Sequence, residues 1–317
     1  LLCAMGWKYV TPQACLARRG GNRGVLLEDS LLEFLRARRF SFQDQSCALS
    51  NTALASVLAS LKALQNWPGD NHRLYAMLKD GVDVMELIPN QQAQSISVPL
   101  IDWQNQRANL FEVTQQLAVP GQPGEFDIVC FINGIPVCAM LASDVAAAVL
   151  VRQHCQWQGM EPGRVPSLYL FAQVLLVLGG EDGRYASILS GEKFWTRWNE
   201  EEMPLTSLQR LRRMPLPAET ATALLADLAP AQRQAVRSQW SVQEATDAPV
   251  FTPTEQLLCG LLLPERLLAY LDWAVAREQR SSKRVARSHQ FFAVRALLAR
   301  LSQHLPGASA KELGARA

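Results

Sequence analysis

An asparagine–glycine pair between two apolar runs restricts the fold of this chain more than any other feature of its sequence. The runs are Asp-Ile-Val-Cys-Phe-Ile at positions 127–132 and Ile-Pro-Val-Cys-Ala-Met-Leu at positions 135–141, and Asn133-Gly134 joins them. Asn-Gly favours a type I′ turn, because both central residues of that turn need a positive φ. Successive positions in both runs are apolar, so both faces of the two strands are expected to be covered. The sequence therefore predicts a β-hairpin in the middle of a covered sheet.

The segments around this hairpin show the periodicity of helices and strands in a mixed order. Helices are predicted over residues 26–38, 51–64 and 144–157. Strands outside the hairpin are predicted over residues 82–88, 97–101, 110–119, 167–178 and 185–189. We expect Asp144 to cap the helix that follows the hairpin. This order of elements predicts an α/β (α+β) fold, in which a mixed sheet is flanked by helices.

The last third of the chain is richer in Leu, Ala and Arg. Helices are predicted there over residues 220–228, 231–240, 264–280 and 283–305. The chain has 317 residues, 49% of them apolar, which is enough for two domains or for one domain with a helical extension. We predict an α/β domain over residues 1–203 and a helical segment over residues 204–317.

The composition argues against several classes of protein. No apolar stretch reaches the roughly 18 residues that a membrane-spanning helix needs. The seven cysteines are scattered without a Cys-x-x-Cys pair, which argues against zinc and fits a reducing cytoplasm. The net charge of +2 indicates nothing about nucleic acid, so any DNA-binding surface has to be a local patch.

Two basic clusters are candidates for such a patch. The first comprises Arg277, Arg280, Lys283, Arg284 and Arg287. The second comprises Arg18, Arg19 and Arg23. Clusters of this kind are usually solvated faces, and contact with DNA phosphates is the alternative for both.

Short distinctive stretches occur nearly from end to end of the chain. They include Met5-Gly-Trp-Lys-Tyr-Val10, Leu78-Lys-Asp-Gly-Val-Asp-Val84, Leu100-Ile-Asp-Trp103, Phe126-Asp-Ile-Val129, Phe131-Ile-Asn-Gly-Ile-Pro136, Val165-Pro-Ser-Leu168, Glu192-Lys-Phe194 and Ser288-His-Gln-Phe-Phe-Ala-Val294. In their order and spacing they resemble the N-terminal region of the R (motor) subunit of type I restriction enzymes. The resemblance implies a restriction-endonuclease-like fold of the PD-(D/E)xK type, followed by a helical segment that leads to a helicase motor.

The resemblance also assigns residues to a cleavage site. Asp127 matches the metal-binding Asp of the family, in which a Glu-x-Lys on the second hairpin strand completes the site. Here the Glu and Lys positions hold Leu141 and Ser143. In the family the two carboxylates hold Mg²⁺ and the Lys helps to activate water. We therefore expect a vestigial site that holds Mg²⁺ weakly and does not cut DNA, with Asp144 as an alternative metal ligand.

Two further residues match motifs of the family. Gln153 matches the Gln of a Gln-x-x-x-Tyr motif, with Trp157 where the Tyr would be; ordinary packing against the sheet is the other explanation for this pair. Gln290 lies in His-Gln-Phe-Phe, which resembles the Q-motif whose Gln reads the adenine of ATP. The phosphate-binding loop Gly-x-x-x-x-Gly-Lys-[Ser/Thr] is missing from the sequence. ATP hydrolysis by this chain is therefore not expected, and an amphipathic helix is the favoured explanation for the motif.

The resemblance implies double-stranded DNA and the methyltransferase and specificity subunits of a type I restriction complex as partners. Whether the chain is an enzyme stays open. One alternative is a non-catalytic pseudo-nuclease module that binds DNA or a partner protein. Another is an active Mg²⁺-dependent endonuclease with relocated ligands. The last is an unrelated α/β protein whose motif matches are coincidental.

Overall fold

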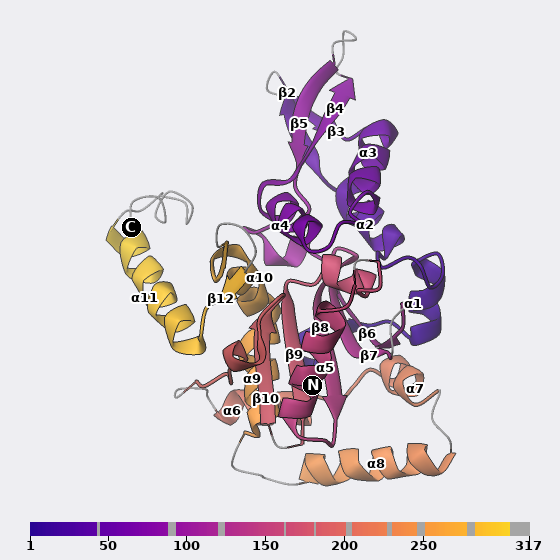
Figure 1. Cartoon of the computed structure of the whole chain (residues 1–317), viewed down its shortest axis with the longest axis vertical. Coiled ribbons are helices and arrows are strands. Elements are labelled where there is room, and N and C mark those ends of the chain that lie inside the picture. The colour runs from indigo at the N-terminus through magenta and orange to yellow at the C-terminus, as the bar shows by residue number, and fades with distance from the viewer. Residues whose placement is uncertain are drawn as a thin grey trace.

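A six-stranded mixed sheet forms the centre of the molecule (Figure 1). The computed structural model describes residues 1–42, 45–87, 93–119, 124–161, 163–180, 182–200, 205–226, 230–245, 251–277 and 283–304. In spatial order the strands are β1 (Lys8–Tyr9), β6 (Phe111–Leu117), β7 (Phe126–Ile132), β8 (Ile135–Ser143), β9 (Val174–Gly179) and β10 (Asp182–Ser187). The β1–β6 and β8–β9 pairs are parallel, and the other three pairs are antiparallel.

The predicted central hairpin is confirmed as β7 and β8. Asn133 and Gly134 have φ values of 52° and 76°, as a type I′ turn requires. A Cβ on Gly134 would lie 2.2 Å from the carbonyl oxygen of Leu27, so only glycine fits there. The Asn133 side chain is fully buried, donates to the carbonyl of Leu100 and accepts from the amide of Leu110. The turn is therefore anchored to the loops beside it as well as to its own strands.

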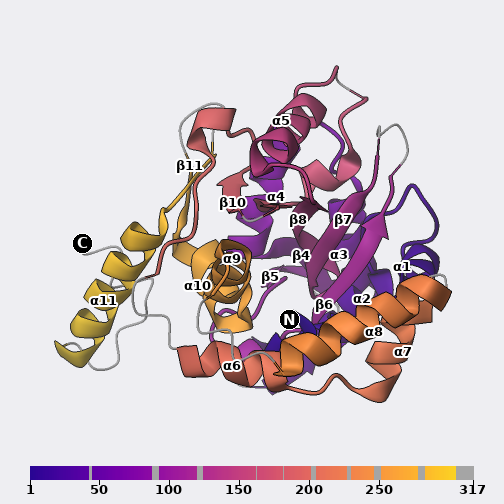
Figure 2. The same cartoon turned by 90° about the horizontal axis from the view of Figure 1, so that it is seen from below.

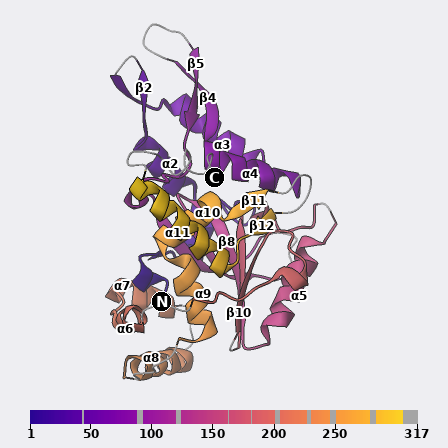
Figure 3. The same ribbon diagram turned by 90° about the vertical axis from the view of Figure 1, so that its left-hand side faces the viewer.

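Helices cover both faces of the sheet. Their bounds are α1 (Pro12–Arg18), α2 (Glu28–Arg36), α3 (Asn51–Lys62), α4 (Gly69–Asp80), α5 (Ala147–Gln158), α6 (Leu205–Arg213), α7 (Ala218–Ala226), α8 (Pro230–Ala245), α9 (Pro253–Leu262), α10 (Pro264–Trp273) and α11 (Ser288–His304). Figures 2 and 3 show α5 on one face of the sheet and α9 and α10 on the other. None of the helices, as far as the structure describes them, is long and apolar enough to span a membrane.

Some predicted strands lie elsewhere. β4 (Val82–Leu87) and β5 (Ala93–Val98) form a hairpin of their own, outside the central sheet. Buried and exposed side chains alternate along β4, so one of its faces is solvated, unlike the faces of the central strands. This hairpin and the hairpin of β2 (Arg39–Phe42) and β3 (Gln45–Ala48) extend from one end of the molecule (Figure 1).

Several predictions of element bounds were wrong in part. The strand expected over 97–101 is β5, which runs from Ala93 to Val98. The expected strand over 167–178 begins only at Val174, because residues 167–170 form a 3-10 helix; the Asn71 side chain donates to the carbonyls of Tyr169 and Ala172 there. The helix expected over 264–280 ends at Trp273. The helix expected from residue 283 begins at Ser288, because β11 (Val275–Arg277) and β12 (Lys283–Val285) lie between them.

The segment after residue 204 contacts the sheet domain through α4. Three residues on one face of α4, spaced four apart, make these contacts. Asn71 accepts from the Lys283 ammonium, Tyr75 donates to the carbonyls of residues 271 and 275, and Lys79 pairs with Asp272. In a further contact, the Trp7 indole donates to the carbonyl of Leu262 at 2.8 Å. The domain boundary at residues 203/204 stays a prediction.

Candidate functional site

Asp127 is the second residue of β7 and lies half-buried at the end of the hairpin away from the turn. Its Oδ2 accepts a hydrogen bond from the amide of Ala142 at 2.8 Å. On its other side the ladder with β6 is interrupted, because Gln116 takes a φ of 54° between the paired residues Gln115 and Leu117. The carboxylate therefore lies where regular pairing with β6 is interrupted. On the side of β8, it takes the place of a backbone carbonyl as the acceptor for the amide of Ala142.

The residues that face Asp127 on β8 carry no acid. Ile128 pairs with Met140, and this register, extended by one residue, sets Asp127 opposite Leu141. Directly opposed residues of antiparallel strands project from the same face. Leu141 is only 2% exposed, whereas Ser143 at the end of β8 is exposed. The two positions assigned to Glu and Lys thus present an apolar side chain and a hydroxyl beside Asp127.

Asp144 is exposed and does not cap α5, which corrects the prediction. The helix begins at Ala147 with Ala146 as its N-cap, and no side chain caps it. The turn before the helix is fixed by contact with β9: a Cβ on Gly179 would lie 2.6 Å from the backbone of Ala147. Within the part of the chain that the structure describes, no group of three or more His, Cys, Asp and Glu side chains comes together in a way that could hold a metal ion.

α5 rests on the sheet through an aromatic cluster that includes one of the predicted residues. Trp157 is buried and meets Phe126, the neighbour of Asp127, edge to face at 5.3 Å. Gln153 is half-buried, and its side chain makes no hydrogen bond to the described residues. The contacts of Trp157 are those of a residue that packs the helix against the sheet. A direct role of Gln153 at the site stays a prediction.

The same cluster contains His154, which the sequence analysis did not single out. Its imidazole is fully buried, stacks on Trp195 at 5.3 Å and lies 2.7 Å from the Tyr169 hydroxyl. The Leu176 carbonyl, 3.3 Å from Nε2, can only accept, so Nε2 carries the proton and Nδ1 accepts from Tyr169. Burial lowers the pKa of His154 to about 3. The signal was available, because Leu150, Val151, His154 and Trp157 share one face at helical spacing.

Gln290 lies in the first turn of α11. Its Oε1 accepts from the amide of Arg287, the residue before the helix, at 2.9 Å. A side chain at this position that reaches back to the N-cap amide is half of a capping box. Phe291, the next residue, is fully buried and stacks on Trp273 at 4.6 Å. Within the part of the chain that the structure describes, these contacts hold the first turn of α11 in place.

Several members of the two basic clusters are bound internally. Arg18 pairs with Asp29 and with Glu112, and Glu112 is 3% exposed and also accepts from the Ser30 hydroxyl. Although burial alone would lower the pKa of Arg18, its two acidic partners raise it. The other internal residues are Arg19, which is buried and donates to the carbonyl of Gly24, and the buried Lys283. The idea that these clusters are solvated faces is therefore wrong for three of their members.

The remaining basic residues divide into two groups. Arg23 and Arg287 are exposed. Arg280 and the side chains of Arg277 and Arg284 lie outside what the structure describes. Each cluster has at least one member that is bound internally, so neither forms an exposed patch that includes all of its residues.

Comparison with known proteins gives matches that are consistent with one another. Residues 1–194 match the family described as type I restriction enzyme R protein N terminus. The type I restriction enzyme HindI endonuclease subunit of Haemophilus influenzae is 23% identical over 313 residues, which cover 92% of this chain and 25% of that protein. The putative type I restriction enzyme MjaIXP endonuclease subunit of Methanocaldococcus jannaschii is 31% identical over 129 residues, which cover 39% of this chain and 12% of that protein. The chain thus spans about a quarter of the length of the first relative.

Proposed function

Since this chain belongs to the family of type I restriction enzyme R protein N termini, we propose that it forms the nuclease-like domain of an R-subunit-like protein whose own cleavage site is inactive. The similarity to two endonuclease subunits supports the first part of this proposal. The central hairpin with Asp127 at its open end, followed by a helix and a parallel strand, supports a PD-(D/E)xK restriction-endonuclease-like fold.

The observation that carries the second part is the residue opposite Asp127. Leu141 is buried and offers no oxygen, and one oxygen of Asp127 is already hydrogen-bonded to the amide of Ala142. Mg²⁺ demands near-octahedral oxygen coordination and gives up its water reluctantly, so sites usually supply one or two carboxylates as well as substrate oxygens. The residues present do not fit such an ion well. Ser143, in the position of the Lys, cannot supply its positive charge.

The proposal names DNA and two protein subunits as partners, and it does not assign ATP binding to Gln290. Double-stranded DNA is the substrate class that a nuclease-like domain would contact, through phosphates rather than bases. The methyltransferase and specificity subunits of a type I restriction-modification complex are the proposed protein partners. Because Oε1 of Gln290 already accepts from the helix N-cap amide, we assign this residue to helix capping and not to ATP.

A plasmid-nicking assay tests the proposal. The full chain is incubated with supercoiled DNA and either Mg²⁺ or Mn²⁺, beside the variants Asp127→Ala and Asp144→Ala. We expect no strand cleavage by any of the three proteins, and retarded migration of duplex DNA in a gel-shift assay. Cleavage that Asp127→Ala abolishes would refute inactivity. Cleavage that also requires Asp144 would establish the relocated-ligand alternative.

A further inference from the structure

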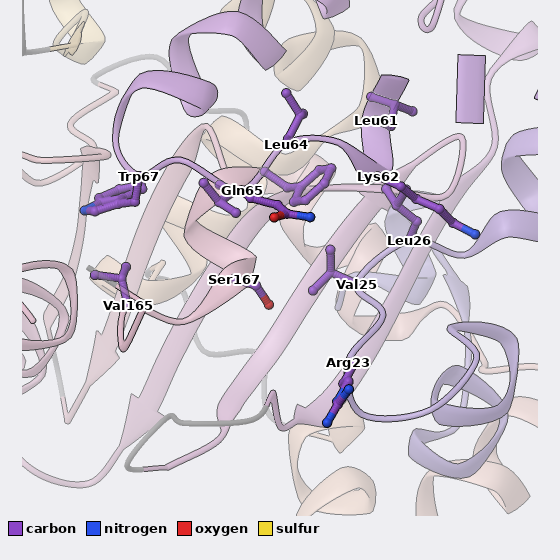
Figure 4. Close-up of a pocket in the computed structure, with 13 residues that line it drawn as sticks. Arg23, Val25, Leu26, Leu61, Lys62, Leu64, Gln65, Trp67, Val165 and Ser167 are labelled. Carbon is purple, nitrogen blue, oxygen red and sulfur yellow. The ribbon is translucent and has the colours of Figure 1, made fainter. Parts of the chain in front are cut away.

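A cavity of 340 Å³ lies between three segments that are far apart in the sequence. These are the loop before α2, the end of α3 with the residues that follow it, and the segment that leads to β9. Figure 4 shows their side chains around one opening. Its apolar lining includes the buried side chains of Leu26, Leu61, Leu64, Leu170 and Phe171. The volume is at the lower end of the range for small-molecule sites, which are mostly apolar with a few polar groups.

The cavity is separate from the Asp127 site. Leu27, next to Leu26, donates to the carbonyl of Gly134, which places this wall at the turn of the central hairpin. Asp127 lies at the other end of the hairpin, across from Leu141. Ile135 and Leu141 are six residue steps apart along β8, a length of roughly 20 Å.

Hydrogen bonds fix the walls, and of the side chains that line the cavity they use that of Trp67. The amides of Gln65 and Asn66 both donate to Oδ2 of Asp70 at 2.7 Å, which holds the chain after α3. The Trp67 indole donates to the carbonyl of Gln158 at 3.2 Å and packs beside Tyr169. A site held in this way is formed before a ligand arrives, so little ordering cost opposes binding.

The charged side chains that line the cavity are all positive, as far as the structure describes the lining. Arg23 and Lys62 are cations, Lys62 pairs with Glu28 at 2.7 Å, and no acidic residue is among the described residues of the lining. The Arg23 guanidinium, the side-chain amide of Gln65 and the Ser167 hydroxyl make no hydrogen bond to residues that the structure describes. An exposed cation and two neutral hydrogen-bonding groups therefore surround an apolar floor.

We propose that this cavity binds a small aromatic anion, in which a flat apolar body carries one carboxylate, sulfonate or phosphate group. The rings would lie on Leu26, Leu61 and Phe171. The anionic group would face Arg23, with Ser167 and Gln65 as hydrogen-bond donors. The proposal does not depend on the state of the Asp127 site.

A pair of fluorescent probes that differ in one group tests the charge preference. The probe 1-anilinonaphthalene-8-sulfonate carries the anion, and N-phenyl-1-naphthylamine has the same rings without it. We expect one saturable site for each. Arg23→Ala should weaken binding of the sulfonate about fivefold and leave binding of the neutral probe unchanged. The reason is that an exposed ion pair contributes up to about 1 kcal/mol, which corresponds to a factor of about five in affinity. Arg36→Ala, which removes an exposed arginine outside the lining, should change neither.

A filling variant and two competitors complete the test. Ser167→Phe should abolish binding of both probes while the thermal melt shows that the chain stays folded; persistent binding would place the probes elsewhere and overturn the proposal. An equal effect of Arg23→Ala on both probes would overturn the charge preference. Displacement of the sulfonate by adenosine 5′-monophosphate would identify a phosphorylated nucleoside, and displacement by indole-3-acetate alone an aromatic carboxylate. Displacement by neither would contradict the ligand class.

Discussion

The buried His154 predicts a specific loss of stability in mild acid. Its pKa is about 3 in the folded protein because the imidazole is fully buried, against about 6.5 in an unfolded chain. Between these two values the unfolded chain binds a proton and the folded protein does not. The contribution of His154 to stability is therefore fully present above pH 6.5 and is lost progressively as the pH falls towards 3.

The size of the effect follows from the same two values. Between pH 7 and pH 5 the unfolded imidazole becomes almost fully protonated while the folded one stays neutral, which lowers the free energy of unfolding by about 2 kcal/mol. Urea unfolding of the whole chain, followed at pH 7 and at pH 5, measures this difference. His154→Phe should remove the part of the pH dependence that comes from this group.

The control variant is Tyr169→Phe. Both variants lose the 2.7 Å hydrogen bond between the imidazole and the phenol, so both are expected to be less stable at pH 7 by about 1–3 kcal/mol. Only His154→Phe removes the titrating group. If the two variants lose the same amount of stability between pH 7 and pH 5, the buried neutral imidazole is not the cause and the reasoning is wrong.

Three other predictions concern the segment after residue 204. A chain that ends at residue 203 loses the partners of Trp7, Tyr75 and Lys79, so its Tm should fall by roughly 10 °C or more; an unchanged melt would instead establish the boundary predicted from the sequence. Lys283→Met leaves buried acceptors without their donor and should cost about 3 kcal/mol in urea unfolding, and a loss below 0.5 kcal/mol would argue against this anchor. Gln290→Ala should weaken amide protection at the start of α11 by about 1 kcal/mol in hydrogen exchange; unchanged protection would rule out the cap.

The central hairpin could be predicted because its determinants are local. Asn133 and Gly134 specify the turn by their backbone preferences, and the uninterrupted apolar runs on both sides specify strands covered on both faces. The register that this turn sets would place Asp127 opposite Met140. A register shift between Cys130 and Phe131 moves Asp127 to Leu141 instead, and no local signal in the sequence predicted that shift. The helical spacing around Leu31 and Val57 likewise predicted α2 and α3 nearly to their bounds.

What could not be predicted depends on partners distant in sequence. Arg18 and Lys283 look like members of surface clusters, yet one is held by Glu112, 94 positions away, and the other by Asn71, 212 positions away. The 3-10 helix over 167–170 has a long-range cause as well, because the Asn71 side chain binds the carbonyls of that segment. Burial of polar groups of this kind is decided by tertiary contacts, which no local pattern records.

Titration with Mn²⁺, followed by calorimetry, tests most directly the proposal that Leu141, in the position assigned to the second acid, disables the site at Asp127. Leu141→Glu returns a second carboxylate to the position opposite Asp127. We predict at least tenfold tighter binding of Mn²⁺ by this variant than by the unaltered chain, and loss of that gain when Asp127→Ala is added. Equally tight binding by the unaltered chain, abolished by Asp127→Ala alone, would contradict the account.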